Sequence, residues 1–131
     1  MNLDLSQEHE LVRRTVREFA EERIAPVAEE LDREHRFPYD IVAEMAELGL
    51  MGIPFPEEWG GAGGDTLSYA IAIEELTRVD SSVAITVAAH TSLGTMPIFM
   101  FGSEEQKRTW LPDLVAGKRL ASFGLTEPGA G

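Results

Sequence analysis

The residues best suited to bind a ligand stand at the end of the sequence, in the stretch ASFGLTEPGAG at residues 121–131. A short strand here would bring Thr126 and the neighbouring backbone amides to a turn at residues 128–131. Amide groups at the end of a strand can donate hydrogen bonds to a ring that carries carbonyl oxygens and nitrogens. A threonine before Glu-Pro-Gly is more often simply part of a turn, so the residues alone leave both interpretations open.

Three histidines, His9, His35 and His90, offer a second kind of chemistry. No two of them have the i, i+4 spacing with which a helix presents two metal ligands on one face, so the sequence predicts no metal site. His90 lies in the apolar stretch SVAITVAAHTSLGTMPIFMF. In that setting a hydrogen-bonded core histidine is favoured over a catalytic base.

Two pairs of adjacent carboxylates, Glu57–Glu58 and Glu74–Glu75, could suggest acid–base catalysis. Adjacent residues of a helix point about 100° apart, so Glu74 and Glu75 cannot flank one bond together. We expect both pairs to be solvated surface residues. The sequence contains neither a nucleophile elbow nor a glycine motif for binding phosphate or a dinucleotide.

Composition excludes several functional classes. The 131 residues include no cysteine, which excludes disulfides, thiolate zinc sites and cysteine nucleophiles. The net charge of −12 would repel a phosphate backbone, so no nucleic-acid partner is expected. No apolar run approaches the roughly 18 residues of a membrane span, and the acidic N-terminus is unlike a targeting signal. We therefore expect a cytoplasmic protein without a membrane span.

Apolar periodicity and capping residues predict a chain of helices that must position these groups. Pro26 should kink or restart the first helix, and the region of Gly94 and Pro97 should divide the long apolar segment into two. Ser103 and Gln106 form a capping box for the last helix. The predicted helical segments are residues 6–34, 39–48, 66–79, 81–101 and 103–116.

The predicted fold is therefore all-α, a bundle of about five to six helices. Residues 120–126 are the one stretch that suggests a strand. A lone strand has no partner for its backbone donors and acceptors. We interpret it as a short C-terminal β-strand that belongs to a missing β domain.

Four motifs together resemble the acyl-CoA dehydrogenases, and they stand in the family's order along essentially the whole chain. They are ERIAPVAEELDRE, LGLMGIPFPEEWGGAGGD, SLGTMPIFMFGSEEQKRTWLPDLVAGK and LTEPGAG. The resemblance implies an N-terminal helical domain at residues 1–118, followed at residues 119–131 by the truncated start of a middle β domain.

The resemblance also implies a chemistry. Acyl-CoA dehydrogenases bind FAD and oxidise an acyl-CoA thioester to its trans-2-enoyl form, while a carboxylate removes the α-proton and the β-hydrogen passes as hydride to flavin N5. Their electrons leave to an electron-transferring flavoprotein, and the enzymes are homo-oligomers, either tetramers or dimers. The catalytic glutamate lies in a C-terminal domain that this sequence lacks, so we expect no catalytic residue here and no activity from the chain alone.

By the same resemblance, Phe123, Gly124, Leu125 and Thr126 would contact the flavin. The backbone of Leu125 and the hydroxyl and N–H of Thr126 would face its pyrimidine edge. Donors held at that edge would stabilise the negative charge that develops on a reduced flavin.

The acyl tail would run along positions that match Ile85, Thr86, Ala89 and Leu93, whose small and apolar side chains suit a short to medium tail. Gly131 would also lie at the substrate, because the family motif continues from it with Ser-Asp, whose serine commonly touches acyl-CoA. Two alternatives remain open. One is a related acyl-CoA oxidase, and the other is a stand-alone helical interaction module without catalysis.

Overall fold

Capping side chains set where four of the helices begin in the computed structural model, which describes residues 4–131. Ser6 accepts a hydrogen bond from the backbone of His9, and Asp65 accepts one from Ser68. Ser103 and Gln106 form the predicted capping box. These side chains satisfy backbone N–H groups that have no partner within their own helix.

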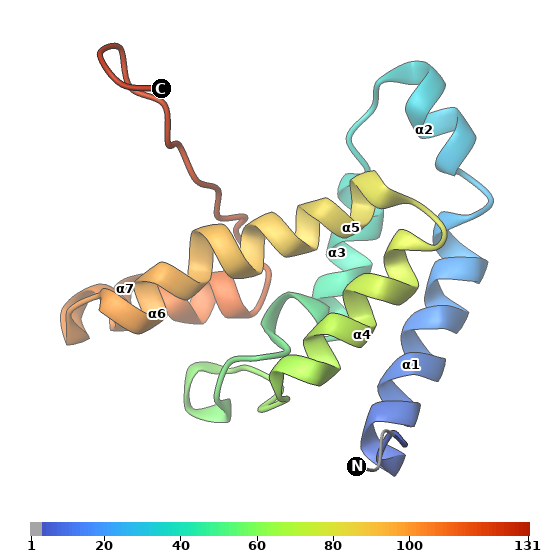
Figure 1. Cartoon of the computed structure of the whole chain (residues 1–131), viewed down its shortest axis with the longest axis horizontal. Helices are drawn as coiled ribbons and strands as arrows, with labels where there is room; N and C mark the ends of the chain where they lie inside the picture. Colours follow the sequence, from blue (N-terminus) through green and yellow to red (C-terminus); the bar gives the residue numbers. More distant parts are fainter. Residues whose placement is uncertain (1–3) are drawn as a thin grey trace.

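The helices form a bundle from which the C-terminal segment, defined here as residues 120–131, extends away (Figure 1). They are α1 (Gln7–Phe19) with a π-helical turn (Ala20–Ile24), α2 (Ala28–Glu34), α3 (Tyr39–Glu47), α4 (Thr66–Thr77), α5 (Ser81–Ala88), a π-helical stretch (Ala89–Thr95), α6 (Met96–Phe101) and α7 (Glu104–Val115). Short 3-10 turns occur at Leu50–Gly52 and Glu57–Trp59. Because α5, the π-helical stretch and α6 run on as one helix, the described residues form six continuous helices. The predicted all-α bundle is confirmed.

The longest helix, Ser81–Phe101, is not divided where the sequence suggested. A π-helical stretch carries the chain through Gly94, and Pro97 falls in the first turn of α6. Proline is tolerated in the first turn of an α-helix, and the π-helical stretch before α6 carries the chain up to it without a break. The predicted break at Gly94 and Pro97 was therefore wrong.

Ser81–Phe101 is also the one helix within residues 4–131 whose length and apolar composition match those of a membrane span. The prediction that no apolar run approaches the length of a membrane span was therefore wrong. Its Val83, Ala84 and Val87 are buried among the other helices of the bundle. Buried core helices pass the same test of length and composition, so the match is weak evidence for a span.

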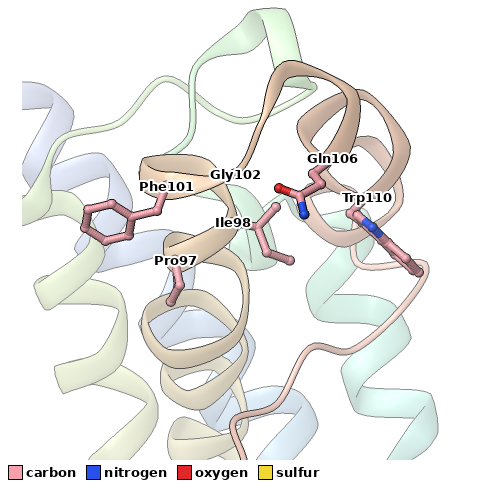
Figure 2. Close-up of a pocket in the computed structure, with 6 residues that line it drawn as sticks. All are labelled: Pro97, Ile98, Phe101, Gly102, Gln106 and Trp110. Atoms are coloured by element: carbon pink, nitrogen blue, oxygen red, sulfur yellow. The ribbon is translucent and has the colours of Figure 1, made fainter.

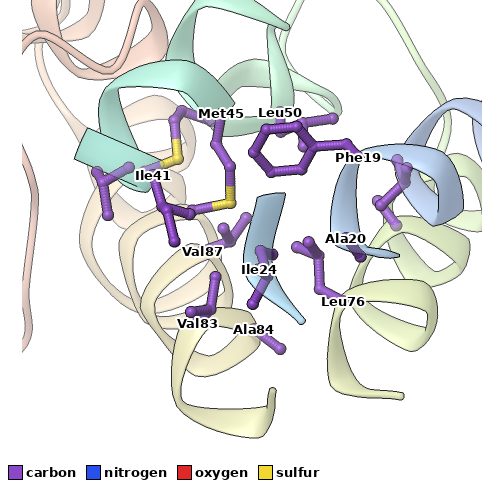
Figure 3. Close-up of a cluster of buried hydrophobic side chains, with 14 of the residues drawn as sticks. Phe19, Ala20, Ile24, Ile41, Met45, Leu50, Leu76, Val83, Ala84 and Val87 are labelled. Atoms are coloured by element: carbon purple, nitrogen blue, oxygen red, sulfur yellow. The ribbon is translucent and has the colours of Figure 1, made fainter. Parts of the chain in front are cut away.

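The main core lies where α1, α3, α4 and α5 meet (Figure 3). Phe19 and Ile24 from the first helix pack with Met45, Leu76 and Val87. A second, smaller cluster of Phe55, Leu111 and Val115 joins α7 to the loop before α4. The first cluster contains residues of α5, and residues of α6 pack against the second, so the long helix is held near both of its ends.

The C-terminal segment does not form the predicted strand. Its only sheet-like pairing within the described residues is one isolated bridge between Glu127 and Ala130, which closes the turn at Pro128 and Gly129. No neighbouring strand offers a ladder to residues 120–126, so they run extended without one.

Candidate functional site

The C-terminal segment leaves the bundle at His90, a residue of the long helix that is 1% exposed. The Nδ1 atom of His90 accepts a hydrogen bond of 3.0 Å from the backbone N–H of Ala121. Its Nε2 atom lies 3.0 Å from the backbone oxygen of Leu114, near the end of α7. Both ring nitrogens are therefore occupied, and the prediction of a satisfied core histidine agrees with this geometry.

Burial lowers the pKa of His90, and the bond to Leu114 opposes this shift only in part. A neutral ring has one donor and one acceptor nitrogen. The acceptor must be Nδ1, because Ala121 offers it an N–H, and the donor is then Nε2. The environment thus fixes both the charge and the tautomer of the ring.

Gly94, one turn further along the same helix, lies directly beneath the segment. A Cβ atom placed on Gly94 would lie 2.3 Å from the Cβ of Ala121 and 2.9 Å from the backbone nitrogen of Ser122. Real Cβ atoms do not approach other atoms so closely. The segment can therefore cross the helix at this point only because residue 94 has no side chain.

Beyond Ser122 the segment is exposed and carries the four residues expected at the flavin. Phe123 is 56% exposed and Leu125 is 72% exposed. Within the described residues, no hydrogen bond joins the backbone of residues 122–126 to the rest of the chain. The N–H groups of Leu125 and Thr126 are consequently available to a bound molecule.

The residues expected at the acyl tail lie along the long helix but do not share one groove. Ile85 is 61% exposed and lines a groove of about 420 Å³ with Ile73 and Thr77 of α4. Thr86 instead lines a different groove of about 350 Å³, which His35 and the chain before α3 complete. The Thr86 hydroxyl donates to the backbone oxygen of Ser82 at 3.0 Å.

The remaining substrate candidates lie outside both grooves. Ala89 is partly buried in the π-helical stretch, and Leu93 is 50% exposed. Gly131 ends the chain in an exposed position with open space around it. The structure thus places Ile85, Ala89 and Leu93 at partly or well exposed positions of one helix without closing a cavity around them.

A further apolar pocket of about 300 Å³ lies where α6 meets α7 (Figure 2). Ile98 and Gln106 lie between Phe101 on one side and Trp110 on the other. Phe101 is 81% exposed. None of the residues that the sequence analysis proposed to bind cofactor or substrate lines this pocket.

Glu75 corrects one expectation from the sequence, because its side chain is 2% exposed rather than solvated. Arg17 donates to its two oxygens at 2.8 and 2.9 Å, and Arg78 donates to one of them at 2.9 Å. These bonds, with that of Arg17 the strongest influence, hold the pKa of Glu75 below its usual value. Its neighbour Glu74 is exposed, as expected.

A second polar pair joins two helix starts that are far apart in the sequence. His9 lies 3.0 Å from the carboxylate of Asp65, which also caps α4. Hydrogen bonds from Ser68, followed by that of His9, lower the pKa of Asp65 to about 2. Within residues 4–131, no group of three or more His, Cys, Asp or Glu side chains could hold a metal ion.

Comparison with known proteins gives a consistent picture. Residues 6–118 match the sequence model of the N-terminal domain of acyl-CoA dehydrogenase. A probable acyl-CoA dehydrogenase of Bacillus subtilis (strain 168) is 53% identical over all 131 residues, which correspond to 34% of its own length. The chain therefore spans about a third of the length of this relative.

Solved structures share the fold as well. Butyryl-CoA dehydrogenase from Megasphaera elsdenii superposes with a TM-score of 0.93 and 40% identity, over 100% of this chain and 35% of that one. An acyl-CoA dehydrogenase from Bacillus anthracis, complexed with FAD, superposes with a TM-score of 0.90 and 42% identity. That match covers 98% of this chain and 22% of the other.

Proposed function

The chain belongs to the acyl-CoA dehydrogenase family, and from this premise we propose that it is the N-terminal part of an FAD-dependent enzyme that oxidises acyl-CoA to trans-2-enoyl-CoA. The helices would form one wall of the site, and the C-terminal segment would contact the cofactor. The base that removes the α-proton would come from a part of the protein outside these 131 residues. We therefore expect the chain to be inactive by itself.

The observation that carries this proposal is the exposed run of backbone donors at residues 122–126. FAD is the cofactor that the family match and the FAD-bound relative support. The isoalloxazine ring of FAD has two carbonyl oxygens and an unprotonated ring nitrogen along its pyrimidine edge, and these accept hydrogen bonds. The N–H groups of Leu125 and Thr126 and the Thr126 hydroxyl are donors of the matching kind. The residues present thus fit the group.

When bound, FAD would supply the acceptor for the hydride. The role of the segment is then to hold donors where negative charge develops. Removing one such donor in other enzymes reduces the rate by about 10²–10³-fold, because fixed donors need no reorganisation during the reaction. We assign this role to the N–H of Leu125 and to the N–H and hydroxyl of Thr126. Phe123 and Gly124 would contribute packing and backbone contacts beside the ring.

For the substrate, we propose that the acyl tail lies along the exposed side of the helix Ser81–Phe101. Ile85, Ala89 and Leu93 recur there at intervals of four residues, and Thr86, next to Ile85 in sequence, faces a different groove. A butyryl-CoA dehydrogenase among the structural relatives supports a short acyl chain. Gly131 would approach the thioester from the C-terminal segment.

For the partners, we propose an electron-transferring flavoprotein as the electron acceptor and assembly of the whole enzyme into a homo-oligomer. A stand-alone interaction module is less well supported, because large apolar side chains face solvent. Ile85, Leu93 and Phe101 are 61%, 50% and 81% exposed. Exposed apolar surface of this kind is typical of a face that another domain or subunit covers.

The proposal is tested by titrating the 131-residue chain with FAD and following flavin fluorescence. We expect saturable binding that Thr126→Val weakens about two- to tenfold, which is the factor of one net hydrogen bond. Thr77→Val is the matched control, because the Thr77 hydroxyl donates only to the backbone of its own helix, at Ile73. Butyryl-CoA added to the FAD complex should leave the flavin absorbance unbleached.

Two results would count against the proposal. Equal affinity of the Thr126→Val and wild-type chains would remove the Thr126 hydroxyl from the cofactor site. Bleaching of the flavin by butyryl-CoA would show that the base lies within these residues after all.

A further inference from the structure

We propose that His90 and Gly94 are positioning residues that fix the point and direction at which the flavin-contacting segment leaves the helical bundle. This inference rests on the proposed cofactor role of residues 123–126. It adds two residues that lie in the bundle and need not touch the cofactor. We call the pair, together with its contacts to Ala121, the exit anchor.

The first part of the exit anchor is the hydrogen bond between Ala121 and His90. Among the residues that the structure describes, the bond from the Ala121 N–H to His90 Nδ1 is the last hydrogen bond between the segment and the bundle. Because the ring is also tied to the carbonyl of Leu114, it cannot rotate without breaking a second bond. The end of α7 and the start of the segment are therefore held by one rigid side chain.

The second part of the exit anchor is steric. Gly94 lies four residues after His90 in the same continuous helix, and a Cβ at this position would collide with Ala121 and Ser122. The bond and the close approach together fix the position of Ala121 in two ways. Glycine weakens the interior of a helix relative to alanine, so its presence here is explained by the crossing segment and not by the helix.

The distance from Ala121 to Thr126 shows why the direction in which the segment leaves the bundle matters. Thr126 lies five residues beyond Ala121, so an extended chain places it about 17 Å away. Within the described residues, no hydrogen bond to the bundle holds the chain between Ala121 and Thr126. A change of direction at Ala121 would therefore displace Thr126 by several ångströms, well beyond hydrogen-bond tolerance.

The two hydrogen bonds of His90 can be removed one at a time by substitution. The side-chain oxygen of asparagine stands at the same branch position as His Nδ1, so His90→Asn retains an acceptor for Ala121. The side-chain nitrogen of glutamine stands at the position of Nε2, so His90→Gln retains the donor to Leu114 instead. A role confined to core packing would favour His90→Gln over His90→Asn, because glutamine is closer to histidine in size.

The experiment measures amide hydrogen exchange at Ala121 by NMR in the 131-residue chain, with and without FAD. We expect His90→Gln to speed exchange at Ala121 roughly two- to tenfold, the factor of one net hydrogen bond. His90→Asn should keep exchange near the wild-type rate. The FAD-induced shift of the Thr126 amide should be lost in His90→Gln and kept in His90→Asn.

Gly94→Ala provides a second test that does not depend on His90. The new methyl group must displace Ala121, while alanine favours the helix itself. We expect an unchanged or higher melting temperature together with faster exchange at Ala121 and loss of the Thr126 response to FAD. Gly129→Ala is the matched control, because nothing lies within 4 Å of a Cβ at Gly129 and Gly129 is not among the residues proposed to contact the flavin.

The outcomes separate this inference from the proposed function. Equal Ala121 exchange in the wild-type chain and both His90 variants would overturn the exit anchor, whatever FAD does. Altered exchange with an unchanged Thr126 response would overturn its positioning role and leave the cofactor contact intact. No response of Thr126 to FAD in the wild-type chain would overturn the proposed cofactor contact, while Ala121 exchange would still decide whether the anchor exists.

Discussion

The buried carboxylate of Glu75 offers the sharpest test of how the bundle is held together. Arg17 binds it through two hydrogen bonds of 2.8 and 2.9 Å, and Arg78 adds a third of 2.9 Å. The contact joins α1 to α4, which are also packed side by side. We predict that Glu75→Gln, which keeps the shape and removes the charge, destabilises the fold.

The size of the effect follows from the exposure of the partners. Removing one member of a fully buried ion pair destabilises a protein by about 3–5 kcal/mol. Here the Arg17 and Arg78 side chains are 45% and 46% exposed, so water can solvate them once Glu75 is gone. We therefore expect a smaller loss, about 2–3 kcal/mol, comparable to one or two charged hydrogen bonds.

The assay is urea unfolding at neutral pH, followed by circular dichroism. With a slope of about 1–3 kcal/mol per M for a domain of this size, the midpoint should fall by about 0.7–3 M. Glu74→Gln is the matched control, since Glu74 is the exposed neighbour, and it should change stability by less than about 0.5 kcal/mol. Equal midpoints for the two variants would refute the reasoning.

The same site predicts a pH dependence of definite sign. The pKa of Glu75 is lower in the folded chain than its ordinary value. Its contribution to stability is therefore complete above the unfolded pKa of about 4.3. The contribution is lost as the pH falls through the lower folded value. The difference between the wild-type chain and Glu75→Gln should narrow in that acid range.

Two further predictions concern helix starts. The pKa of Asp65 should be measured by NMR at about 2, so its contribution to stability is present above the unfolded value of about 3.9 and is lost as the pH falls toward 2. A titration midpoint near 3.9 would contradict its bonds to Ser68 and His9. Ser103→Ala, which removes the cap of α7, should lower the free energy of unfolding by about 1 kcal/mol in the same urea assay. An effect no larger than that of Ser122→Ala, at an exposed position, would contradict the capping role.

Local signals in the sequence predicted most of the helical fold correctly. The capping residues Ser6 and Ser103 act at the helix starts as expected, and Pro26 separates α1 and its π-helical turn from α2. These features depend on residues within one turn of each other, where propensity and capping are decisive. The uninterrupted helix through Gly94 was missed, because a π-helical stretch has no simple sequence pattern.

The features that the sequence could not reveal all depend on distant partners. Glu75 resembles its exposed neighbour in sequence, and its burial follows from Arg17, which lies 58 residues earlier. The partners of His90 lie 24 and 31 residues away. The glycine at position 94, four residues after a histidine in an apolar segment, was the one available hint of a crossing chain. The cofactor and substrate residues themselves stay predictions.

The contact between the C-terminal segment and the flavin is the central element of the proposed function. The most direct test is an FAD titration of the ¹⁵N-labelled chain, with ADP as a control ligand that lacks the isoalloxazine ring. We predict saturable amide shifts at residues 123–126 with FAD and none there with ADP. Shifts that are absent from residues 123–126, or equal for the two ligands, would contradict the assignment.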